Sequence, residues 1–366
     1  MVIQASVDTP TASSDQALTK AIACTSAYGK GGLGRHFAEI VEEARSQGRL
    51  ARFYSCWPKG DDPASVALPP QVARWLPYSP WRYSPGWLNH LENELFDRAV
   101  ARALAPAQEF EGFGGQVLHS FRQAKRLGYQ RLSLQAANSH VSNVMSQHQQ
   151  ALRRWPVETS WLNAAQRQKT LKEYELADTI VVTSEYSYQS FLQAGVPDSK
   201  LRRRQLRVNP RFIPSAQPSG DDVFRVVYVG SLTVAKGIPL LVEAFAQLAE
   251  PAAELVLIGG WATRGMRQYL QGWMAKDSRI RVAPGDPLPH LHRASVCVHP
   301  TYEDGFAYAP LEAMACNVPV IVTADTGMKD YVREGINGYV VPTGDIDALV
   351  DRLVACRNTP LKGGLQ

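Results

Sequence analysis

Along most of the chain, short apolar runs alternate with amphipathic stretches. Continuous apolar runs are typical of parallel strands covered on both faces, and their alternation with helical stretches predicts βαβ units. In the first half, strands are expected at residues 21–25, 51–57, 116–119, 132–136 and 179–183. In the second half, they are expected at residues 224–230, 253–259, 280–283, 294–300, 319–324 and 338–341. The pattern predicts an α/β fold with two doubly wound, Rossmann-like domains that face each other across a ligand-binding cleft.

One amphipathic stretch follows the first predicted strand. Apolar residues recur at helical spacing from Leu33 to Ala44, and Gly48 is expected to end that helix. A shift toward turn-forming residues at 213–222 marks the predicted domain boundary. The predicted parts are a polar N-terminal segment (1–20), an N-terminal Rossmann-like domain (21–215) and a C-terminal Rossmann-like domain (216–366).

Composition narrows the class of protein. The 366 residues suffice for two ordinary domains, and a hydrophobic content of 45% is normal for a soluble globular protein. A formal charge of +5, without an aromatic–basic repeat, does not favour nucleic-acid binding. Arginines cluster at Arg202, Arg203, Arg204 and Arg207. A solvated face is the simpler interpretation of this cluster, and contact with an anionic membrane or acceptor is the alternative.

The cysteines and the N-terminus bear on the compartment. The five cysteines are scattered, and no two have the spacing of metal ligands. They are expected to be small buried hydrophobes in a reducing compartment. The first twenty residues are polar, and the chain has no apolar run of about 20 residues. The sequence therefore predicts a cytoplasmic protein, with peripheral contact at the inner face of the membrane left open.

Three glycine-containing loops fall where a predicted strand runs into a helix. The first, Gly29–Gly34, matches the Gly-x-Gly-x-x-Gly dinucleotide fingerprint. That fingerprint also needs an acid at the end of the second strand, and residues 51–57 contain none. Nicotinamide and flavin are therefore disfavoured. The glycines still let the backbone approach a ligand ahead of a helix N-terminus, and a plain tight turn is the structural alternative.

The other two loops carry charge. In Val229–Gly237, the Lys236 ammonium could neutralise a diphosphate, although a lone solvated lysine is the simpler interpretation. Asp304 and Glu312 lie eight residues apart around a glycine turn, and Pro310 is expected to open the following helix. Backbone N–H groups and the helix dipole there suit an anion, and carboxylates suit hydroxyls. An ordinary acidic loop is the alternative, but the combination favours a sugar nucleotide.

These motifs resemble those of the family 4 glycosyltransferases (group 1 type), which have the two-domain GT-B fold. The family's Glu-x7-Glu motif corresponds to Asp304 and Glu312, and its Gly-Arg-Leu-x3-Lys-Gly loop corresponds to Gly230–Gly237. The Gly-Gly-Leu-Gly turn at Gly31–Gly34 and the segment 173–186 add to the resemblance, which covers roughly residues 21–355. It is specific in the second domain and looser in the first.

The resemblance implies retaining transfer of a sugar from a nucleoside diphosphate sugar to an acceptor hydroxyl, in polysaccharide or glycoconjugate biosynthesis. The N-terminal domain would lie on the acceptor side, and the C-terminal domain would bind the donor. The implied catalytic residues are Lys236, Asp304, Glu312 and His140. The implied donor-binding residues are Gly31, Gly32, Gly230, Ser231, Val282, Gly305, Phe306, Ala307 and Tyr308.

The resemblance also implies a role for each group. Lys236 would bind the diphosphate, Glu312 the ribose and Asp304 the sugar hydroxyls. The backbone amides of 306–308 would cover the phosphates, Gly32 would close over them, and the backbone near Val282 would flank the base. His140 would lie near the sugar and the acceptor, with His119 as its rival for that role.

No cofactor or metal is implied, because the nucleotide sugar is a co-substrate. Asp345-Ile346-Asp347 resembles a metal-binding Asp-x-Asp motif but is better interpreted as a helix N-cap with a first-turn acid. The expected partners are the nucleotide-sugar donor and a carbohydrate, lipid-linked or small-molecule acceptor, without nucleic acid.

Departures from the family pattern leave alternatives open. Ser231 stands where the family has arginine, with Arg264 as a candidate replacement, and Asp304 is one methylene shorter than the family's glutamate. Ser231 and the short segment after residue 355 favour a catalytically silent nucleotide-sugar-binding subunit as one alternative. An epimerase or phosphorylase of similar fold is another.

An aromatic stretch bears on the acceptor. It contains Trp75, Tyr78, Trp81, Tyr83 and Trp87, interleaved with Arg74 and Arg82. These side chains could form an acceptor wall or a membrane-interface contact, and a small satellite core is the structural alternative.

Overall fold

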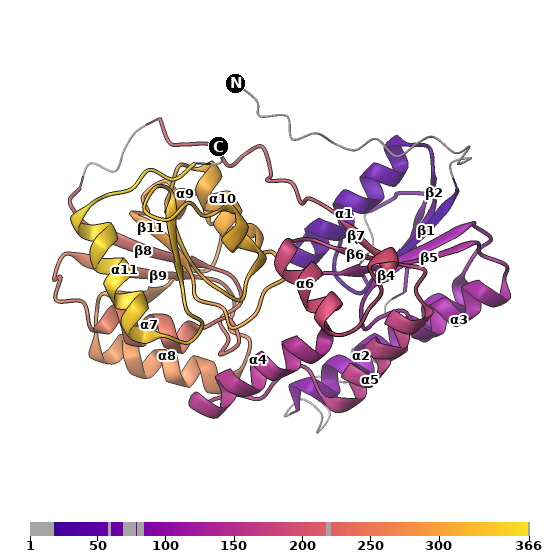
Figure 1. Ribbon diagram of the computed structural model, residues 1–366, viewed down its shortest axis with the longest axis horizontal. Coiled ribbons are helices and arrows are strands. Elements are labelled where there is room, and N and C mark those ends of the chain that lie inside the picture. The colour runs from indigo at the N-terminus through magenta and orange to yellow at the C-terminus, as the bar shows by residue number, and fades with distance from the viewer. Residues whose placement is uncertain (1–17, 58–59, 69–77, 79–83, 217–220, 365–366) are drawn as a thin grey trace.

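Two parallel sheets form the framework of the protein. The structure is a computed structural model that describes residues 18–57, 60–68, 78, 84–216 and 221–364. Figure 1 shows one sheet with its helices built from the indigo-to-magenta half of the chain, and the other from the orange-to-yellow half. We call the first sheet with α1–α6 the first lobe, and the second sheet with α7–α11 the second lobe.

The first sheet has the strand order β3-β2-β1-β4-β5-β6-β7, and every described pair is parallel. Its strands are β1 (Lys20–Cys24), β2 (Leu50–Ser55), β3 (Ser65–Ala67), β4 (Glu109–Phe113), β5 (Arg131–Ala136), β6 (Thr179–Val182) and β7 (Leu201–Arg203). Its helices are α1 (Gly31–Ser46), α2 (Pro85–Ala103), α3 (Leu118–Arg126), α4 (Val141–Arg154), α5 (Ala164–Leu176) and α6 (Glu185–Gln193).

The second sheet has the order β10-β9-β8-β11-β12-β13 and is also parallel throughout its described pairs. Its strands are β8 (Phe224–Val229), β9 (Ala253–Ile258), β10 (Ile280–Val282), β11 (Val296–His299), β12 (Val320–Thr323) and β13 (Gly338–Val341). Its helices are α7 (Ile238–Ala246), α8 (Arg264–Lys276), α9 (Leu288–Leu291), α10 (Tyr308–Ala315) and α11 (Ile346–Asn358). A 3-10 turn, η5, spans Gly327–Tyr331.

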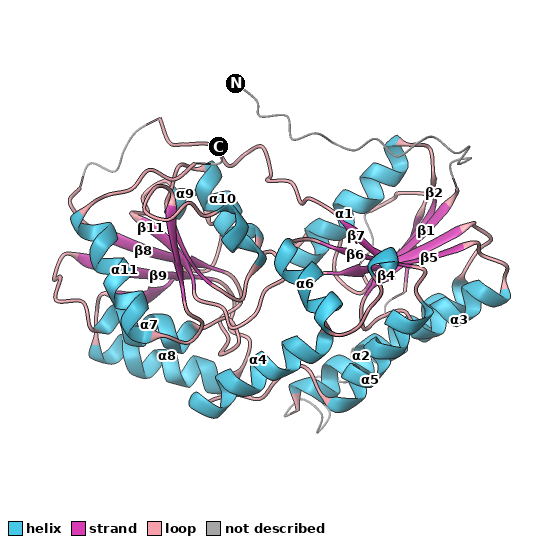
Figure 2. Cartoon of the chain, viewed as in Figure 1, coloured by secondary structure: helices cyan, strands magenta, loops and turns pink. Residues whose placement is uncertain are grey.

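Helices cover both sides of each sheet, as Figure 2 shows. The continuous apolar strands are therefore buried on both faces, as parallel sheets require. The predicted α/β fold with two doubly wound sheets is confirmed. The helix expected after the first strand is α1, whose apolar face is buried, and Gly48 follows its end with φ +67°. This left-handed conformation favours glycine just past a helix C-terminus.

The strand predicted at 116–119 is wrong, because Leu118 begins helix α3. The strand of that βαβ unit is β4, which is slightly earlier in the chain and carries two buried carboxylates, Glu109 and Glu111. The Lys20 ammonium lies 2.5 Å from Glu111 and 3.3 Å from Glu109, and the Arg49 guanidinium lies 2.9 Å from Glu109, so these charges are neutralised inside the lobe. Paired charges within β4 masked the apolar pattern that the prediction needed.

The end of α4 ties the lobes together. Trp155, just after α4, is 6% exposed and belongs to the same apolar core as β8 and α7 of the second lobe. Its indole Nε1 donates to Glu243 at 2.7 Å, and its ring lies edge-on to Tyr302 with centroids 6.1 Å apart. In Figure 1, α4 lies along the lower edge where the lobes meet. The lobes therefore share buried apolar surface.

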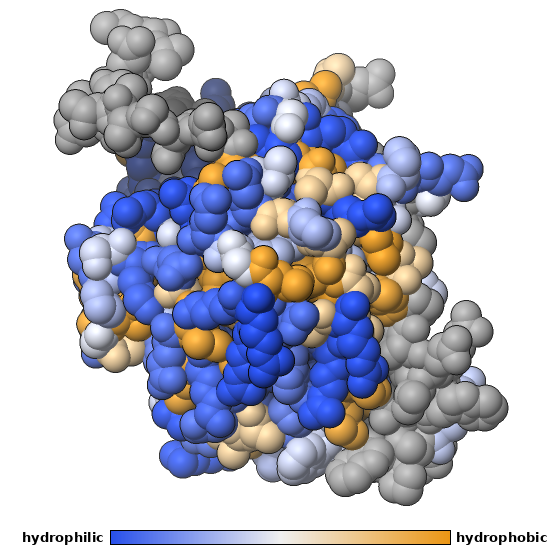
Figure 3. Space-filling model, turned by 90° about the vertical axis from the view of Figure 1, so that its right-hand side faces the viewer, coloured by the Kyte–Doolittle hydropathy of each residue, from blue (hydrophilic) through white to orange (hydrophobic). Residues whose placement is uncertain are grey.

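Surface features agree with several expectations. Arg202, Arg203 and Arg207 are exposed, and the five cysteines are free thiols, four buried and one half-buried. Figure 3 shows the outer face of the first lobe, where hydrophilic residues predominate and apolar residues form a broken band. Within the described ranges, no helix combines the length and the apolar character that crossing a bilayer would need.

Of the aromatic stretch, Tyr78 and Trp87 are 77% and 43% exposed. Trp75, Trp81, Tyr83, Arg74 and Arg82 lie outside the described residues. The satellite-core interpretation therefore gains no support from the two aromatic side chains that the structure describes.

Candidate functional site

The loop between β11 and α10 lies against the first lobe. A Cβ on Gly305 would lie 2.3 Å from the Ala137 carbonyl oxygen, so only glycine fits there. The Ser184 hydroxyl donates to the Gly305 carbonyl at 2.5 Å. Glu303, which is 1% exposed, accepts from Asn138 Nδ2 and from the Ser139 N–H, both at 2.9 Å. The loop with the predicted carboxylates is thus held at the junction of the two lobes.

Lys236 and Asp304 are in direct contact. The Lys236 Nζ lies 2.5 Å from Asp304 Oδ2, and His299 Nε2 lies 3.1 Å from the same oxygen. Lys236 comes from the loop after β8, whereas His299 ends β11 and Asp304 follows it. Because neighbouring parallel strands end at one edge of the sheet, their loops bring the three side chains together.

The charge of Asp304 is fixed by its neighbours. Burial alone would raise the pKa of Asp304, but the Lys236 ammonium and the His299 hydrogen bond outweigh it and hold that pKa well below its usual range. Burial lowers the pKa of His299, which is therefore a neutral imidazole at pH 7. Lys236 and Asp304 accordingly form an ion pair at neutral pH, with the lysine side chain 27% exposed.

The backbone around the loop bends sharply into α10. Ala307 has φ +79°, a conformation that residues other than glycine rarely adopt. Helix α10 begins at Tyr308, so the expectation that Pro310 opens it is wrong by two residues. Pro310 still falls within the first turn, where its missing N–H removes no intrahelical hydrogen bond. Phe306 N–H points to Asp304 Oδ1 at 3.5 Å, a long contact.

Glu312 is bound by a residue that the sequence analysis did not single out. Arg35, on α1, forms an ion pair with Glu312, whose side chain is 2% exposed. The Arg35 guanidinium also lies over the Tyr308 ring, 4.5 Å from its centroid. Burial raises the pKa of Glu312, and the nearby Arg35 opposes that rise. A charge four residues after Gly31, on the predicted helix, was the available signal for Arg35.

A second contact joins the same two helices. The Tyr308 hydroxyl donates to Glu39, one turn after Arg35, at 3.0 Å. A Cβ on Gly32 would lie 3.8 Å from the Tyr308 ring, an ordinary contact distance. Gly31 has φ +65° and starts α1. The glycine loop therefore faces the start of α10 across the lobes.

The loop after β8 is also hydrogen-bonded to the first lobe. Glu158, which precedes α5, accepts from the Val234 N–H at 2.6 Å and from the Thr263 hydroxyl at 2.8 Å. Gly230 has φ +148°, and a Cβ on Gly259 would clash with its carbonyl. This close approach sets the path of the loop that carries Lys236.

Three predicted residues lie at this end of the second lobe without contacting Asp304. Ser231 is exposed, and its carbonyl accepts from the Tyr228 hydroxyl at 2.9 Å. Arg264 is exposed at the first position of α8. Val282 ends the edge strand β10 and is half-buried. Among the described cations, Lys236 is the one that reaches Asp304.

His140 does not join this group. It is the N-cap of α4, its Nδ1 accepts from the Ser142 N–H at 3.3 Å, and its ring packs on Tyr174 and Phe191 with centroids 5.2 and 5.3 Å away. It lines a separate cavity of about 580 Å³ between α4, α6 and the turn that carries Asp325 and Lys329. Its packing is that of a buried hydrogen-bonding residue.

We expect His140 to titrate as a structural residue. Burial, with a smaller contribution from Arg167, lowers its pKa from 6.5 to about 4. A depressed pKa contributes stability above pH 6.5 that is lost as the pH falls toward 4. Relative to His140→Gln, the wild type should therefore lose free energy of unfolding over that window, as urea titrations at several pH values would measure. A constant difference would contradict this expectation.

His119 lies in α3 and not at a strand end, contrary to the sequence-based expectation. It forms a cluster with Glu94 and Asp97 whose ligand atoms lie within 4.8 Å of one another. The Lys169 ammonium lies 2.7 Å from Asp97 and 3.0 Å from Glu94, and the Arg98 guanidinium lies 2.8 Å from Glu94, so cations from the chain already neutralise these acids. Asp345, the other metal-like residue, is the N-cap of α11 and accepts from the Ala348 N–H at 3.0 Å, as expected.

Comparison with solved structures identifies the fold. The chain is similar to sucrose-phosphate synthase from Thermosynechococcus elongatus, with a TM-score of 0.69 and 21% identity over 93% of this chain and 90% of that chain. It is also similar to Anabaena HepE in complex with UDP and glucose, with a TM-score of 0.65 and 15% identity over 93% and 89%. Its two facing parallel sheets have the GT-B fold.

A family profile matches the second lobe, and curated relatives align with part of the chain. Residues 223–358 match the family profile "Glycosyl transferases group 1". The D-inositol 3-phosphate glycosyltransferase of Kribbella flavida is 30% identical over 155 residues, which span 38% of this chain and 37% of that protein. The capsular polysaccharide biosynthesis glycosyltransferase CapM of Staphylococcus aureus is 30% identical over 140 residues, or 36% of each chain. The chain thus aligns with just over a third of the length of these curated relatives.

Proposed function

We propose that the protein is a glycosyltransferase that moves a sugar from a nucleoside diphosphate sugar to an acceptor hydroxyl with retention of configuration. The observation that carries the proposal is the contact of Lys236 with Asp304 at the junction of the lobes, beside the start of α10. An ammonium and the N-terminus of a helix favour a diphosphate, and carboxylates accept hydrogen bonds from sugar hydroxyls. Residues 223–358 match a glycosyltransferase profile, the curated relatives are named as glycosyltransferases, and one fold neighbour was solved with UDP and glucose.

In this proposal, each group acts by position and charge. Lys236 neutralises the diphosphate as it departs, and the N–H groups at 306–308 share that charge. Asp304, kept ionised by Lys236 and His299, orients the donor sugar. Glu312 holds the ribose. Contact between the lobes at Gly305 excludes water from the reacting bond, which limits hydrolysis of the donor.

Arg35 fits the same scheme as the cation that offsets Ser231. It contacts both Glu312 and Tyr308, to which this proposal assigns the ribose and the phosphates. A ribose on Glu312 would release the guanidinium, which would then be free to bind the diphosphate through a bidentate contact.

We predict opposite effects of Arg35→Ala on two ligands. A nucleoside diphosphate should bind roughly tenfold more weakly, because a charged hydrogen bond is lost. The parent nucleoside should bind at least as tightly as to the wild type, because it no longer competes with Arg35 for Glu312. Isothermal titration with both ligands would measure this, with the exposed Arg267→Ala, on α8, as the control. Equal weakening of both ligands would show that Arg35 serves the fold instead.

The function itself is tested by thermal shift with UDP-, GDP- and ADP-sugars. A ligand that binds the folded state raises the melting temperature, and at a hundred times its dissociation constant it adds about 2.7 kcal/mol to stability. We expect one base to give a clear shift and to release its nucleoside diphosphate when an acceptor is added. Absence of a shift with all three would contradict the proposal. A shift without turnover, over a panel of acceptors, would favour the catalytically silent subunit.

A further inference from the structure

A cavity of about 280 Å³ lies in the first lobe beside the candidate donor site. It opens at the carboxyl ends of β1, β4 and β5 and is bounded by α2 and the segment before α5. One wall is the segment Ala137–Ser139, whose backbone abuts Gly305 and whose polar groups bind Glu303. Leu33, next to Gly32, forms part of another wall. The cavity and the Asp304 loop therefore share a boundary.

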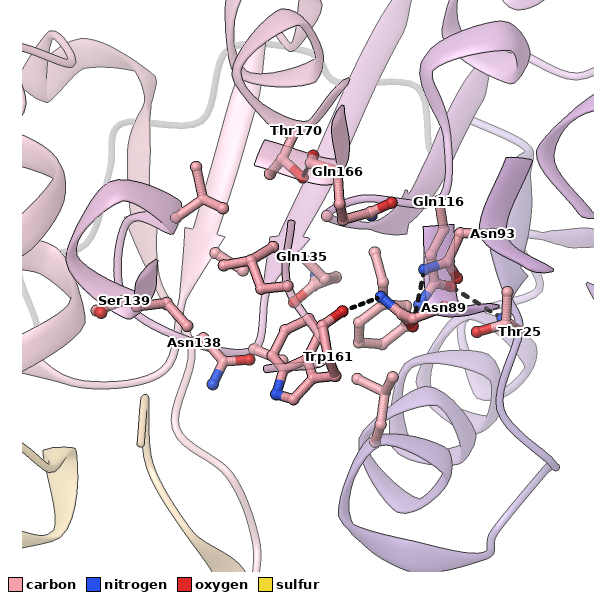
Figure 4. Close-up of a pocket in the computed structure, with 18 of the residues that line it drawn as sticks. Thr25, Asn89, Asn93, Gln116, Gln135, Asn138, Ser139, Trp161, Gln166 and Thr170 are labelled. Atoms are coloured by element: carbon pink, nitrogen blue, oxygen red, sulfur yellow. Dashed lines mark hydrogen bonds between the residues drawn. The ribbon is translucent and has the colours of Figure 1, made fainter. Parts of the chain in front are cut away.

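The polar lining of this cavity is uncharged. Among the described residues that line it, none carries a formal charge. Six of the polar ones carry side-chain amides, and hydroxyl groups, that of Tyr174 among them, add to the polar lining; the amides are those of Asn89, Asn93, Gln116, Gln135, Asn138 and Gln166. Figure 4 shows the amides of Asn89 and Asn93 grouped with Gln116 and Thr25 on one side, and Asn138 and Ser139 on the other. Each side-chain amide offers both donors and acceptors, which matches the hydroxyl groups of a sugar.

Carboxyl groups hold two of these amides in place. Gln135 Nε2 donates to Glu111, and Asn138 Nδ2 donates to Glu303. The described cations of the neighbouring site, Arg35 and Lys236, are paired with acids and do not line the cavity. A phosphate or carboxylate on the ligand would therefore lose its hydration without gaining a cation.

An aromatic side chain completes the lining. Trp161 is 41% exposed, and its ring lies edge-on to His148 with centroids 5.6 Å apart. Its backbone carbonyl accepts from Asn89 Nδ2 at 3.2 Å, which fixes the chain beside the amide cluster. An indole held in this way offers a flat apolar face to the C–H groups of a sugar ring.

We propose that this cavity binds an uncharged sugar ring of the acceptor, and that it discriminates against phosphorylated or acidic sugars. The inference rests on the proposed function for its catalytic meaning, but the cavity's choice of ligand is a separate property. Its volume is near the lower end for small-molecule sites, which suits one sugar ring better than an extended chain.

The test compares matched neutral and charged probes. The probes are methyl glucoside, methyl galactoside, methyl mannoside and N-acetylglucosamine, each beside its 6-phosphate, with UDP, GDP or ADP present. Saturation-transfer NMR with competition titration gives the affinities. At least one neutral probe should bind, and its phosphate should bind more weakly by roughly tenfold or more.

Variants locate the binding. Trp161→Ala should weaken the binding of the neutral probe by roughly tenfold. Trp57→Ala, which removes a 62% exposed indole outside the cavity, should leave that affinity unchanged. Asn89→Lys should shift the preference toward the phosphorylated sugar, because it adds the cation that the lining lacks. Equal binding of phosphorylated probes by the wild type, or an unchanged affinity in Trp161→Ala, would overturn the inference.

The result for the nucleotide separates this inference from the proposed function. If a nucleotide raises the melting temperature but no neutral probe binds, the inference fails and the proposed function stands. If a neutral probe binds but no nucleotide does, the cavity's preference stands and the transferase proposal fails, together with the acceptor role. If neither binds, both are overturned.

Discussion

Replacing Lys236 with alanine should lower the turnover number by about a hundredfold or more, equivalent to about 2.7 kcal/mol of transition-state stabilisation. The reason is that the proposal gives the diphosphate two cations, Lys236 and Arg35, and Ser231 cannot replace the lost ammonium. The affinity for a nucleoside should change little, because the ammonium acts on the phosphates. Steady-state kinetics with the donor identified by thermal shift would measure the loss.

The control for Lys236 is another lysine of the same lobe. Lys276→Ala removes an exposed ammonium in the last turn of α8 and should leave turnover unchanged. Circular dichroism would check that the Lys236 variant is folded, because the variant leaves Asp304 without its main counter-charge. A Lys236→Ala protein that is folded and has near wild-type turnover would refute the assigned role.

Replacing Trp155 with alanine should reduce the free energy of unfolding by about 3–5 kcal/mol. The indole is 6% exposed, fills the core of the second lobe from the end of α4 and donates to Glu243. Its loss leaves a cavity at the place where the lobes share apolar surface, and it leaves the Glu243 carboxylate without this hydrogen bond. Urea unfolding followed by far-UV circular dichroism would measure the change.

Trp57→Ala is the matched control for Trp155, since that indole is 62% exposed and its removal should change stability by less than about 0.5 kcal/mol. A sharper outcome concerns the order of unfolding. If α4 couples the lobes, the wild type should unfold in one transition, and Trp155→Ala should unfold in two. A single transition at the wild-type midpoint would mean that the end of α4 does not hold the lobes together.

The sequence predicted much of the fold because local pattern determines it. Continuous apolar runs mark strands such as β8 and β12, and glycine marks the end of α1. Strand β4 was not predicted because Glu109 and Glu111 are buried within it, and their partners Lys20 and Arg49 lie at least 60 residues earlier in the chain. A buried ion pair cannot be recognised from one strand alone.

Some contacts of the candidate site could be predicted from the sequence, and others could not. The approach of Lys236 to Asp304 follows from two loops at one edge of one sheet, which the strand pattern already implies. The contacts of Arg35 with Glu312, and of Glu158 with the loop after β8, depend on how one lobe is turned against the other. No periodicity within a lobe carries that information. The roles assigned to these residues stay predictions.

The most direct measurement is a crystal structure of the protein with the nucleoside diphosphate that stabilises it. We predict the diphosphate within hydrogen-bond distance of Lys236 and of the N–H groups at 306–308, the ribose on Glu312, and Arg35 turned from Glu312 toward phosphate. A nucleotide bound away from the junction of the lobes, with Lys236 still paired only to Asp304, would contradict the account.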